Sequence, residues 1–312
     1  MKIKVALLIM IMVPVLVQAQ TGKWEIIDSL KFIQPGHQYP WEMKYIKIEK
    51  RGNTICAFGN MSSQYPWNRV SWDNGKTWTS TLMDSARYNH EDYYIPPVIY
   101  DATFINENLS LVACDSGYYF ISYDNLKTWN KKKLDNEFGL YKVSFYNSEY
   151  GLLLTWKQFY YSFDGGKNWI LKKIIAPDSS NKFQILDILI LNQNKIIILN
   201  YDYDKKIRFT SITSDFGDTW EYYYLDTLKF QKMFFLDEMT GWGCGGHQII
   251  PDSPTQKDVI VHTTDGGKTW QKQLDTLVIP SMGLNQIYFI DRENGFAHGL
   301  GRKLWRTTNG GK

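Results

Sequence analysis

The sequence predicts an all-β fold built from repeated copies of one short unit, and two observations carry that prediction. The first is a box, SWDNGKTW at 71–78, that returns in similar form along the rest of the chain. The second is the sequence between the boxes, where short β-branched and aromatic runs are broken by Gly, Asn and Asp without any helical period.

The spacing of the boxes identifies the unit. Aligned on the acidic residue, the copies carry at that position Asp73, Asp124, Asp164, Asp215, Asp265 and Asn309. Successive positions lie 51, 40, 51, 50 and 44 residues apart. A repeat of that length is typical of one β-propeller blade, which has four antiparallel strands. The sequence therefore predicts a six-bladed β-propeller, with a seven-bladed one as the alternative.

The fifth unit shows the strand order expected in each blade. Its inner strand A is predicted at 230–238 (FQKMFFLDE) and strand B at 241–247 (GWGCGGH). Strand C follows at 258–264 (DVIVHTT), then the turn DGGK and strand D at 269–274 (TWQKQL). The other units show the same order, with the second strands AFGN, ACDSG, LLLTW, IIILNYD and GFAHGL.

The box, written Ser/Thr-x-Asp-x-Gly-x-Thr-Trp, resembles the Asp-box of the bacterial neuraminidase repeat. The runs TGWGCGG and NGFAHGLG are similar to those of photosystem II assembly-factor-like and sortilin-type propellers. The resemblance covers almost the whole chain and implies a β-propeller. It implies no single activity, because the superfamily includes sialidases, xyloglucan-cleaving enzymes and binding proteins.

We expect the box to be structural. It falls between strands C and D, where a tight turn needs positive φ, and Gly is placed there in Gly75, Gly166, Gly217 and Gly267. The Asp is expected to accept hydrogen bonds from turn N–H groups and the Thr hydroxyl, and the Trp to wedge between blades. These structural residues are Asp73, Trp78, Asp124, Trp129, Asp164, Trp169, Asp215, Trp220, Asp265 and Trp270.

The first residues indicate export. Lys2 and Lys4 precede an apolar run at 5–17, and small residues before Gln20 match a signal-peptide cleavage site. We therefore expect a signal peptide at 1–19 and a single propeller domain at 20–312, located in the periplasm, at the cell surface or outside the cell. The later apolar runs are too short to span a membrane.

The two ends of the chain are complementary. The stretch TGKWEIIDSL at 21–30 resembles the start of a strand D, whereas the last unit has strands A, B and C and stops in the turn. We predict that strand 23–28 pairs with residues 302–308 and closes the ring. The alternative is a chain truncated after Lys312.

The net charge and the cysteine positions exclude some classes of partner and of covalent link. The formal net charge of +3 falls to +1 once Lys2 and Lys4 are removed, so no basic patch for nucleic acid is indicated. Cys56, Cys114 and Cys244 are widely spaced and lie in apolar runs, which favours buried thiols over disulfides. No cofactor and no metal site are expected.

A binding site is predicted on the face away from the boxes, which carries the B–C and D–A loops. Its long loops lie at 32–42, 60–68 and 84–97, and QYPW occurs in two of them. Flat aromatics beside Asn, Gln and Asp suit sugar rings or extended peptides. The predicted ligand-binding residues are Tyr39, Trp41, Tyr65, Trp67, Tyr88, His90, Tyr93 and Tyr94. The alternative is that these side chains pack the loops on one another.

The sequence favours a monomeric, exported, non-catalytic propeller that binds a protein, peptide or glycan. The alternative is a glycoside hydrolase, for which Asp101 and Asp187 are the paired carboxylates, each five residues before the Asn of an A–B turn. A sialidase would need arginines on inner strands, and we expect none there. A zinc site from His37, His90 and His247, or a cation site in NYDYDKK at 200–206, has no ligand spacing to support it.

Overall fold

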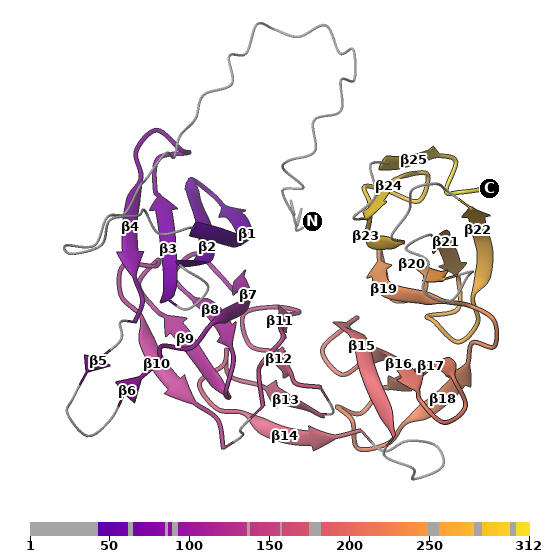
Figure 1. Ribbon diagram of the computed structural model, residues 1–312, viewed down its shortest axis with the longest axis horizontal. Coiled ribbons are helices and arrows are strands. Elements are labelled where there is room, and N and C mark those ends of the chain that lie inside the picture. Colours follow the sequence, from indigo (N-terminus) through magenta and orange to yellow (C-terminus); the bar gives the residue numbers. More distant parts are fainter. Residues whose placement is uncertain are drawn as a thin grey trace, which may run out of the picture. The chain divides into compact units, whose positions relative to one another are not determined.

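The structure is a computed structural model in which the regular elements are strands (Figure 1). It describes residues 43–61, 65–84, 87–88, 93–135, 138–156, 158–174, 182–248, 256–277, 283–299 and 304–312. Within these ranges, no helix has the length and apolar character needed to cross a membrane. The chain divides into two compact units, residues 1–143 and 144–312, which are described separately.

The first unit contains two four-stranded antiparallel sheets, here called blades. The first blade consists of β1 (Met43–Arg51), β2 (Thr54–Met61), β3 (Tyr65–Ser71) and β4 (Thr79–Leu82). The second blade consists of β7 (Ile99–Phe104), β8 (Ser110–Cys114), β9 (Tyr118–Ser122) and β10 (Asn130–Lys133). A short hairpin of β5 (Arg87–Tyr88) and β6 (Tyr93–Tyr94) lies between them in the sequence.

The second unit continues the same pattern from β11, which crosses the unit boundary. The third blade is β11 (Lys142–Phe145), β12 (Gly151–Leu154), β13 (Gln158–Ser162) and β14 (Ile170–Lys173). The fourth is β15 (Phe183–Ile190), β16 (Ile196–Asp202), β17 (Ile207–Thr213) and β18 (Glu221–Tyr224). The fifth is β19 (Phe230–Phe235), β20 (Gly241–Gln248), β21 (Gln256–Thr263) and β22 (Gln271–Leu277). The sixth sheet has β23 (Leu284–Phe289), β24 (Asn294–Gly299) and β25 (Leu304–Thr308).

The expected strand order A-B-C-D is confirmed in the five four-stranded sheets, where sequential strands pair antiparallel. The fifth blade matches its predicted strands to within a few residues at each boundary. Residues 1–19, 23–28 and 302–303 fall outside the described residues, so the signal peptide, the domain limits and the pairing of the termini stay predictions.

Within each unit, the hydrophobic core lies between neighbouring blades. In the first unit, Phe58 and Cys56 of β2 pack with Ile99 of β7 and Phe120 of β9. In the second unit, Ile198 and other residues of the fourth blade pack with the third in the same way. Strand B is buried on both faces in the second, third and fourth blades, which explains why SLVAC, GLLL and the first part of IIILNYD are apolar runs.

The three cysteines are free and buried, as expected. Each lies at full or nearly full burial within a second strand of a blade. Burial raises the pKa of Cys56 and of Cys114 above the ordinary value, because the thiolate loses its hydration. These thiols therefore act as small apolar side chains.

The box is a structural turn. Asp73 accepts the Thr77 backbone N–H at 2.8 Å and the Thr77 hydroxyl at 2.7 Å. Ser71 donates its hydroxyl to the same carboxylate at 2.8 Å and accepts the Gly75 N–H at 2.7 Å. Gly75 has a φ of 89°, and the equivalent Gly166, Gly217 and Gly267 have 83°, 88° and 89°. These bonds recur in the later boxes.

The departures from the box consensus are compensated locally. Asn168 replaces the Thr and donates its side-chain N–H to Asp164 at 2.7 Å. Leu126 replaces the Gly, adopts a φ of 68° and buries its side chain in the core between the first two blades. Asn309 replaces the Asp and accepts the Thr307 hydroxyl at 3.0 Å. The turn therefore survives each substitution.

Candidate functional site

Each blade has two ends that differ in their residues. Because the four strands are antiparallel, the A–B and C–D turns share one end, which we call the box end. The B–C turns and the start of strand A share the other end, which we call the opposite end. The predicted binding site and the predicted carboxylate pair both belong to strands or loops that reach the opposite end.

Strand A carries a register shift at the same place in five blades. The shift lies at Tyr45/Lys47, Ile99/Asp101, Ile185/Asp187, Phe230/Lys232 and Leu284/Gln286. A bulge re-aims the side chain that follows it. The two acids expected in a hydrolase therefore occupy a repeated position that carries Lys or Gln in other blades.

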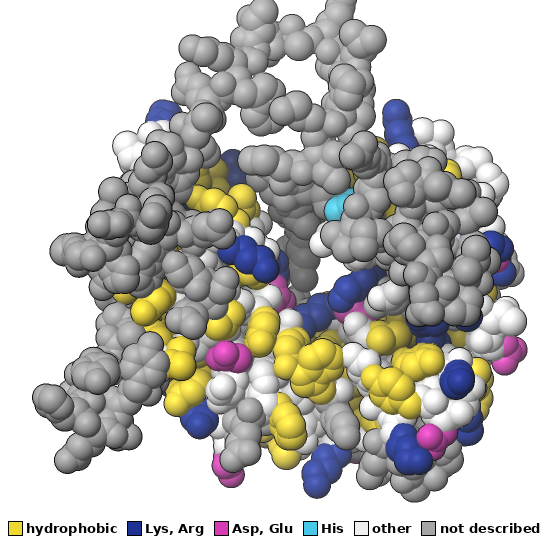
Figure 2. All heavy atoms as spheres, in the orientation of Figure 1, with side chains coloured by type: hydrophobic (Ala, Val, Ile, Leu, Met, Phe, Trp, Pro, Cys, Tyr) yellow, Lys and Arg dark blue, Asp and Glu magenta, His cyan; other side chains and the backbone are white. Residues whose placement is uncertain are grey.

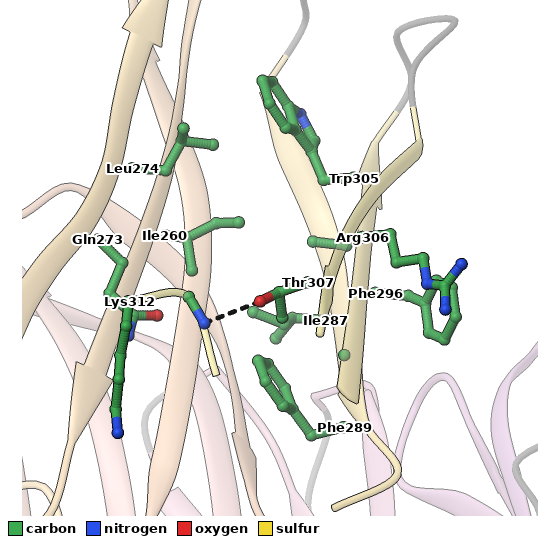
Figure 3. Close-up of a pocket in the computed structure, with 13 residues that line it drawn as sticks. Ile260, Gln273, Leu274, Ile287, Phe289, Phe296, Trp305, Arg306, Thr307 and Lys312 are labelled. Carbon is green, nitrogen blue, oxygen red and sulfur yellow. Dashed lines mark hydrogen bonds between the residues drawn. The ribbon is translucent and has the colours of Figure 1, made fainter. Parts of the chain in front are cut away.

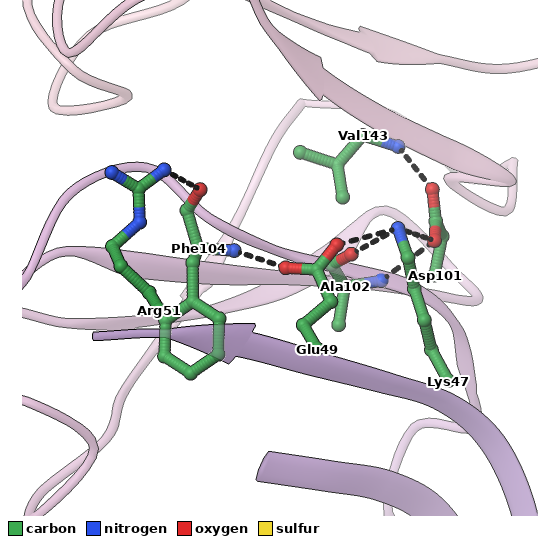
Figure 4. Close-up of polar contacts among 7 residues, drawn as sticks. All are labelled: Lys47, Glu49, Arg51, Asp101, Ala102, Phe104 and Val143. Atoms are coloured by element: carbon green, nitrogen blue, oxygen red, sulfur yellow. Dashed lines mark hydrogen bonds and ion pairs between the residues drawn. The ribbon is translucent and has the colours of Figure 1, made fainter. Parts of the chain in front are cut away.

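Asp101 links three blades (Figure 4). Its Oδ1 accepts Lys47 Nζ of β1 at 2.8 Å and the Ala102 N–H at 2.9 Å. Its Oδ2 accepts the Val143 N–H of β11 at 3.1 Å. The carboxylate thus joins strand A of its own blade to the blades before and after it in the sequence, and both oxygens are engaged.

Lys47 is the centre of the same network. Its Nζ also contacts Glu49 at 3.1 Å and donates to the Ala102 carbonyl at 2.5 Å. Glu49 in turn accepts the Phe104 N–H at 2.6 Å. Burial lowers the pKa of Lys47, but the two carboxylates outweigh it and hold the pKa above the ordinary value. Lys47 is therefore a permanently charged link between β1 and β7.

Asp187 has the equivalent role in the second unit. It is 2% exposed, and its Oδ2 accepts the Met233 N–H of β19 at 2.9 Å. Its Oδ1 accepts the Ile188 N–H at 3.1 Å and lies 4.0 Å from Lys232 Nζ. Like Asp101, it binds the backbone of the next blade. Such an acid has its lone pairs directed at protein donors, which is the arrangement of a structural carboxylate.

Arginine placement differs from the expectation in one case. Arg51 is the last residue of β1, so an arginine does lie on an inner strand. Its guanidinium donates to the Phe104 carbonyl at 3.2 Å, at the box end of β1. The expectation of no inner-strand arginine is therefore wrong for Arg51, but that side chain is at the far end of the strand from the predicted site.

Two predicted binding residues lie in β3 and are described. Tyr65 is half-buried, and Trp67 is only 2% exposed. The Trp67 ring packs edge-to-face on Tyr45 at 5.2 Å, and a Cβ on Gly59 would come within 3.1 Å of its Nε1. Trp67 was expected to offer an open face. It packs within the blade instead, and Tyr45, 43% exposed, is the accessible ring of the pair.

The remaining predicted binding residues are not tested. Tyr39, Trp41 and His90 lie outside the described residues. The structure gives Tyr88, Tyr93 and Tyr94 only as backbone pairing in the hairpin of β5 and β6. Their roles stay predictions.

An exposed aromatic group that the sequence did not single out lies at the opposite end of the second blade. We call Tyr100, Phe138 and Tyr141 the Tyr100 patch. The rings of Tyr100 and Tyr141 are 4.8 Å apart, and Gly139 allows this approach because a Cβ there would lie 3.0 to 3.1 Å from both rings. Tyr100 is 40% exposed and Phe138 59%. Burial, then Tyr141 and Asp115, raise the pKa of Tyr100.

The second unit has exposed rings at the same end of its blades. Trp156 follows β12 and is 46% exposed, and Tyr203 follows β16 and is 53% exposed. Tyr203 donates its hydroxyl to Gln184 at 2.6 Å, which fixes the ring. Figure 2 shows hydrophobic side chains exposed over the third and fourth blades, beside charged ones.

No metal site emerges from the residues that the structure covers, where no three potential ligands come together. Within NYDYDKK, Asp202 accepts the N–H groups of Asp204 and Lys205 at 2.9 and 2.8 Å, so it forms a turn. His37 and His90 lie outside the described residues, and the side chain of His247 is not described.

Comparison with known proteins identifies the fold. No family model matches the chain, and no curated protein matches its sequence. Among solved structures, YCF48 from Cyanidioschyzon merolae matches with a TM-score of 0.56 at 14% identity, over 86% of this chain and 81% of that one. A GH74 xyloglucanase from Xanthomonas campestris matches with a TM-score of 0.56 at 13% identity, over 88% of this chain and 46% of that one. YCF48 bound to D1 peptide matches with a TM-score of 0.46 at 16% identity, over 88% and 96%. At these identities the likeness to the first two shows the fold, and the all-β β-propeller prediction is confirmed.

Proposed function

We propose that this protein is an exported, non-catalytic β-propeller that binds a protein, peptide or glycan at the opposite end of its blades. The observation that carries the proposal is the Tyr100 patch, in which the rings of Tyr100 and Tyr141 lie 4.8 Å apart at that end, and Tyr100 and Phe138 are exposed. Rigid aromatic rings provide contact area at a low cost in side-chain entropy, which is why ligand-binding surfaces are rich in them.

Polar groups beside the patch can orient a ligand. Asp115 follows β8 at the same end of the blade, and its carboxylate accepts the Val98 N–H at 3.0 Å. Burial raises the pKa of Asp115, although that hydrogen bond lowers it. A half-buried acceptor next to aromatic rings suits the hydroxyl groups of a sugar or the N–H groups of a peptide.

The engagement of the two acids supports a binding role over hydrolysis. A glycoside hydrolase needs one carboxyl group that can give up a proton and a second that can face the sugar or a water molecule. Asp101 and Asp187 instead accept backbone N–H groups of the next blade at 3.1 and 2.9 Å. The hydrolase stays the alternative function, with these two residues as its test.

The experiment is a glycan and peptide array probed with the wild-type protein and with Tyr100→Ala/Phe138→Ala. The matched control is Tyr123→Ala, because Tyr123 lies at the box end of the same blade and is 41% exposed, against 40% for Tyr100. We expect a hit that the double variant loses and the control keeps. Equal binding by all three proteins would reject the Tyr100 patch as the site.

Hydrolysis is tested on the ligand found. The wild type and Asp101→Asn are incubated with it, and the products are analysed by mass spectrometry. We expect intact ligand with both proteins. Cleavage by the wild type that Asp101→Asn abolishes while it still unfolds cooperatively would establish the hydrolase instead.

A further inference from the structure

The Tyr100 patch lies beside a carboxylate that has no cation partner. Asp115 is half-buried, and its Oδ1 accepts the Val98 N–H at 3.0 Å. Among the residues that the structure describes, none donates a hydrogen bond to Asp115 Oδ2 and none forms an ion pair with this carboxylate. Asp84 of the same unit differs, because it pairs with Lys131 at 2.8 Å. The charge of Asp115 is therefore uncompensated.

Backbone and electrostatic contacts place Asp115 next to Tyr100. The Asp115 N–H donates at 3.0 Å to the carbonyl of Val98, which directly precedes β7. Tyr100 is the second residue of β7. Asp115 contributes to the raised pKa of Tyr100, after burial and Tyr141, so its charge acts on that ring.

The second ring of the patch is held at the same strand end. The Leu140 N–H donates at 2.8 Å to the carbonyl of Cys114, the residue before Asp115. This bond fixes the segment that continues into Tyr141, whose ring lies 4.8 Å from that of Tyr100. The two rings and the carboxylate therefore form one site.

Tyr100 also lacks the cation that another tyrosine of its blade has. The Tyr118 ring centroid lies 5.3 Å from Lys131 Nζ and 5.0 Å from Lys133 Nζ. In the described part of the chain, no Lys or Arg lies over the ring of Tyr100, which is 40% exposed. The face of an aromatic ring attracts a cation within about 6 Å. Tyr100 and Asp115 thus both favour a cation that the described residues do not supply.

A cavity in the second unit has the opposite character. Its volume is about 190 Å³, and its walls are largely apolar, with Ile260 and Leu274 facing Phe289 across it (Figure 3). The charged side chains among its lining residues are those of Arg306 and Lys312, and none of the lining residues is acidic. This cavity does not suit a basic side chain.

We propose that the Tyr100 patch binds a basic side chain of a peptide, with the cationic group between the Asp115 carboxylate and the exposed ring of Tyr100. This inference rests on the proposed function, since it takes the same patch as the site. It narrows the ligand from a protein, peptide or glycan to a peptide that carries Lys or Arg.

The chemistry of the site favours a cation over a neutral group. A half-buried carboxylate has lost part of its hydration, and a bound cation compensates for that loss better than a neutral donor does. Hydrogen bonds between charged groups are also about twice as strong as those between neutral ones. Because a guanidinium group stacks on an aromatic face while it donates in its own plane, we expect Arg to bind more tightly than Lys.

The test uses the full chain and a set of acetylated, amidated peptides Gly-Ser-Xaa-Ser-Gly with Arg, Lys, citrulline or Glu at the centre. Citrulline is the matched control for Arg, because it keeps the shape and hydrogen-bond donors of the side chain but has no charge. Ligand-observed NMR titration measures the dissociation constants. We expect the citrulline peptide to bind about tenfold more weakly than the Arg peptide, and the Glu peptide not to bind.

The variant Asp115→Asn keeps an oxygen for the Val98 N–H and removes the charge. We expect it to bind the Arg and citrulline peptides equally. The control is Asp124→Asn, which removes one charge from the box end of the same blade and should keep the wild-type preference for Arg. Tyr100→Ala should weaken the binding of both peptides.

Two results would overturn the inference and leave the proposed function in place. One is equal binding of the Arg and citrulline peptides by the wild type, or an Arg preference that Asp115→Asn retains, with binding that Tyr100→Ala weakens. The other is a neutral glycan or an acidic peptide that binds the wild type, and not Tyr100→Ala, while the Arg peptide does not bind. If Tyr100→Ala weakened the binding of no ligand, the inference and the proposed function would both fail.

Discussion

The two ends of each blade follow different rules. At the box end, the same bonds recur from blade to blade: the box Asp accepts the backbone N–H of a residue four positions later at 2.8 to 2.9 Å in the first and second blades. At the opposite end, Trp67 is buried in the first blade whereas Tyr100 is 40% exposed in the second. A repeated turn maintains the fold, and variation at the other end leaves room for a specific ligand.

The two acids that link neighbouring strands A, Asp101 and Asp187, share one contact and differ in another. Asp101 is paired with a charged lysine at 2.8 Å and is half-buried, whereas Asp187 is 2% exposed and its nearest lysine lies 4.0 Å away. Both nevertheless accept a backbone N–H of the following strand A. The shared bond is therefore the structural function, and the lysine is an addition that varies.

The largest expected effect comes from a box tryptophan. Trp270 is 7% exposed and contacts Phe230 at 4.8 Å and Phe235 at 5.9 Å. Trp270→Ala should lower the free energy of unfolding by about 3 to 5 kcal/mol, because it removes a large buried side chain and leaves a cavity. Urea unfolding followed by circular dichroism measures it.

Trp156→Ala is the control for that variant, since Trp156 is 46% exposed at the opposite end. We expect a change within about 0.5 kcal/mol. Equal losses for the two tryptophans would remove the distinction between the ends.

The next effect concerns the buried acid. Asp187→Ala should cost about 2 to 3 kcal/mol, because the Met233 and Ile188 N–H groups lose their acceptor at a buried site. Asp187→Asn keeps one acceptor oxygen and should lose less. If the alanine variant kept the wild-type urea midpoint, the carboxylate would be free for another role, and the hydrolase alternative would gain support.

A single box acid has a smaller expected effect. Asp265 accepts the Thr269 N–H at 2.9 Å and the Thr269 hydroxyl at 2.5 Å, near the surface. Asp265→Ala should cost about 1 kcal/mol in the free energy of unfolding. Asp265→Asn should cost less, since Asn309 fills this position in the sixth box and still accepts a hydroxyl. A larger loss for Asn than for Ala would contradict this account of the turn.

The ionisation of the box aspartates is expected to make a small contribution to the pH dependence of the free energy of unfolding. Hydrogen bonds from the Thr77 backbone N–H and hydroxyl, then from Ser71, lower the pKa of Asp73 to about 2. Because the folded-state pKa lies below the unfolded value of about 3.9, this bond network stabilises the fold above about pH 4 and is lost as the pH falls toward 2.

Asp73→Asn should therefore flatten the fall of the urea midpoint between pH 4 and pH 2, at low salt. Asp215, with a pKa of about 2 caused chiefly by the Thr219 hydroxyl and N–H, should behave alike. The effect is modest because both carboxylates are exposed to solvent. An unchanged slope in the two asparagine variants would assign the acid sensitivity to other groups.

The features that repeat from blade to blade could be predicted from the sequence, and the contacts that differ between blades could not. The box turn, strand order and buried cysteines follow from local patterns, since a tight turn needs Gly and a two-sided buried strand needs an apolar run. The link from Lys47 to Asp101 joins residues that are far apart in the sequence and depends on bulges in two strands. Its one sequence signal is a charged residue, or Gln286 in the sixth sheet, at the same position of strand A.

The Tyr100 patch escaped detection for a similar reason. Tyr100 is on β7 and Tyr141 precedes β11, and only the fold brings their rings to 4.8 Å. Trp67 shows the converse, because a conspicuous motif, QYPW, proved to contain a packed ring. Exposure depends on the neighbouring strand, which composition does not reveal.

The central claim is that ligand binding belongs to the opposite end of the blades. Its most direct test is the dissociation constant of the best array ligand for Tyr100→Ala and for Tyr123→Ala, two tyrosines of one blade with matched exposure of 40% and 41%. Loss of one aromatic contact should weaken binding about tenfold in Tyr100→Ala, on the order of 1.4 kcal/mol. Tyr123→Ala should bind like the wild type. Weaker binding by Tyr123→Ala, with Tyr100→Ala unchanged, would place the site at the box end and contradict the account.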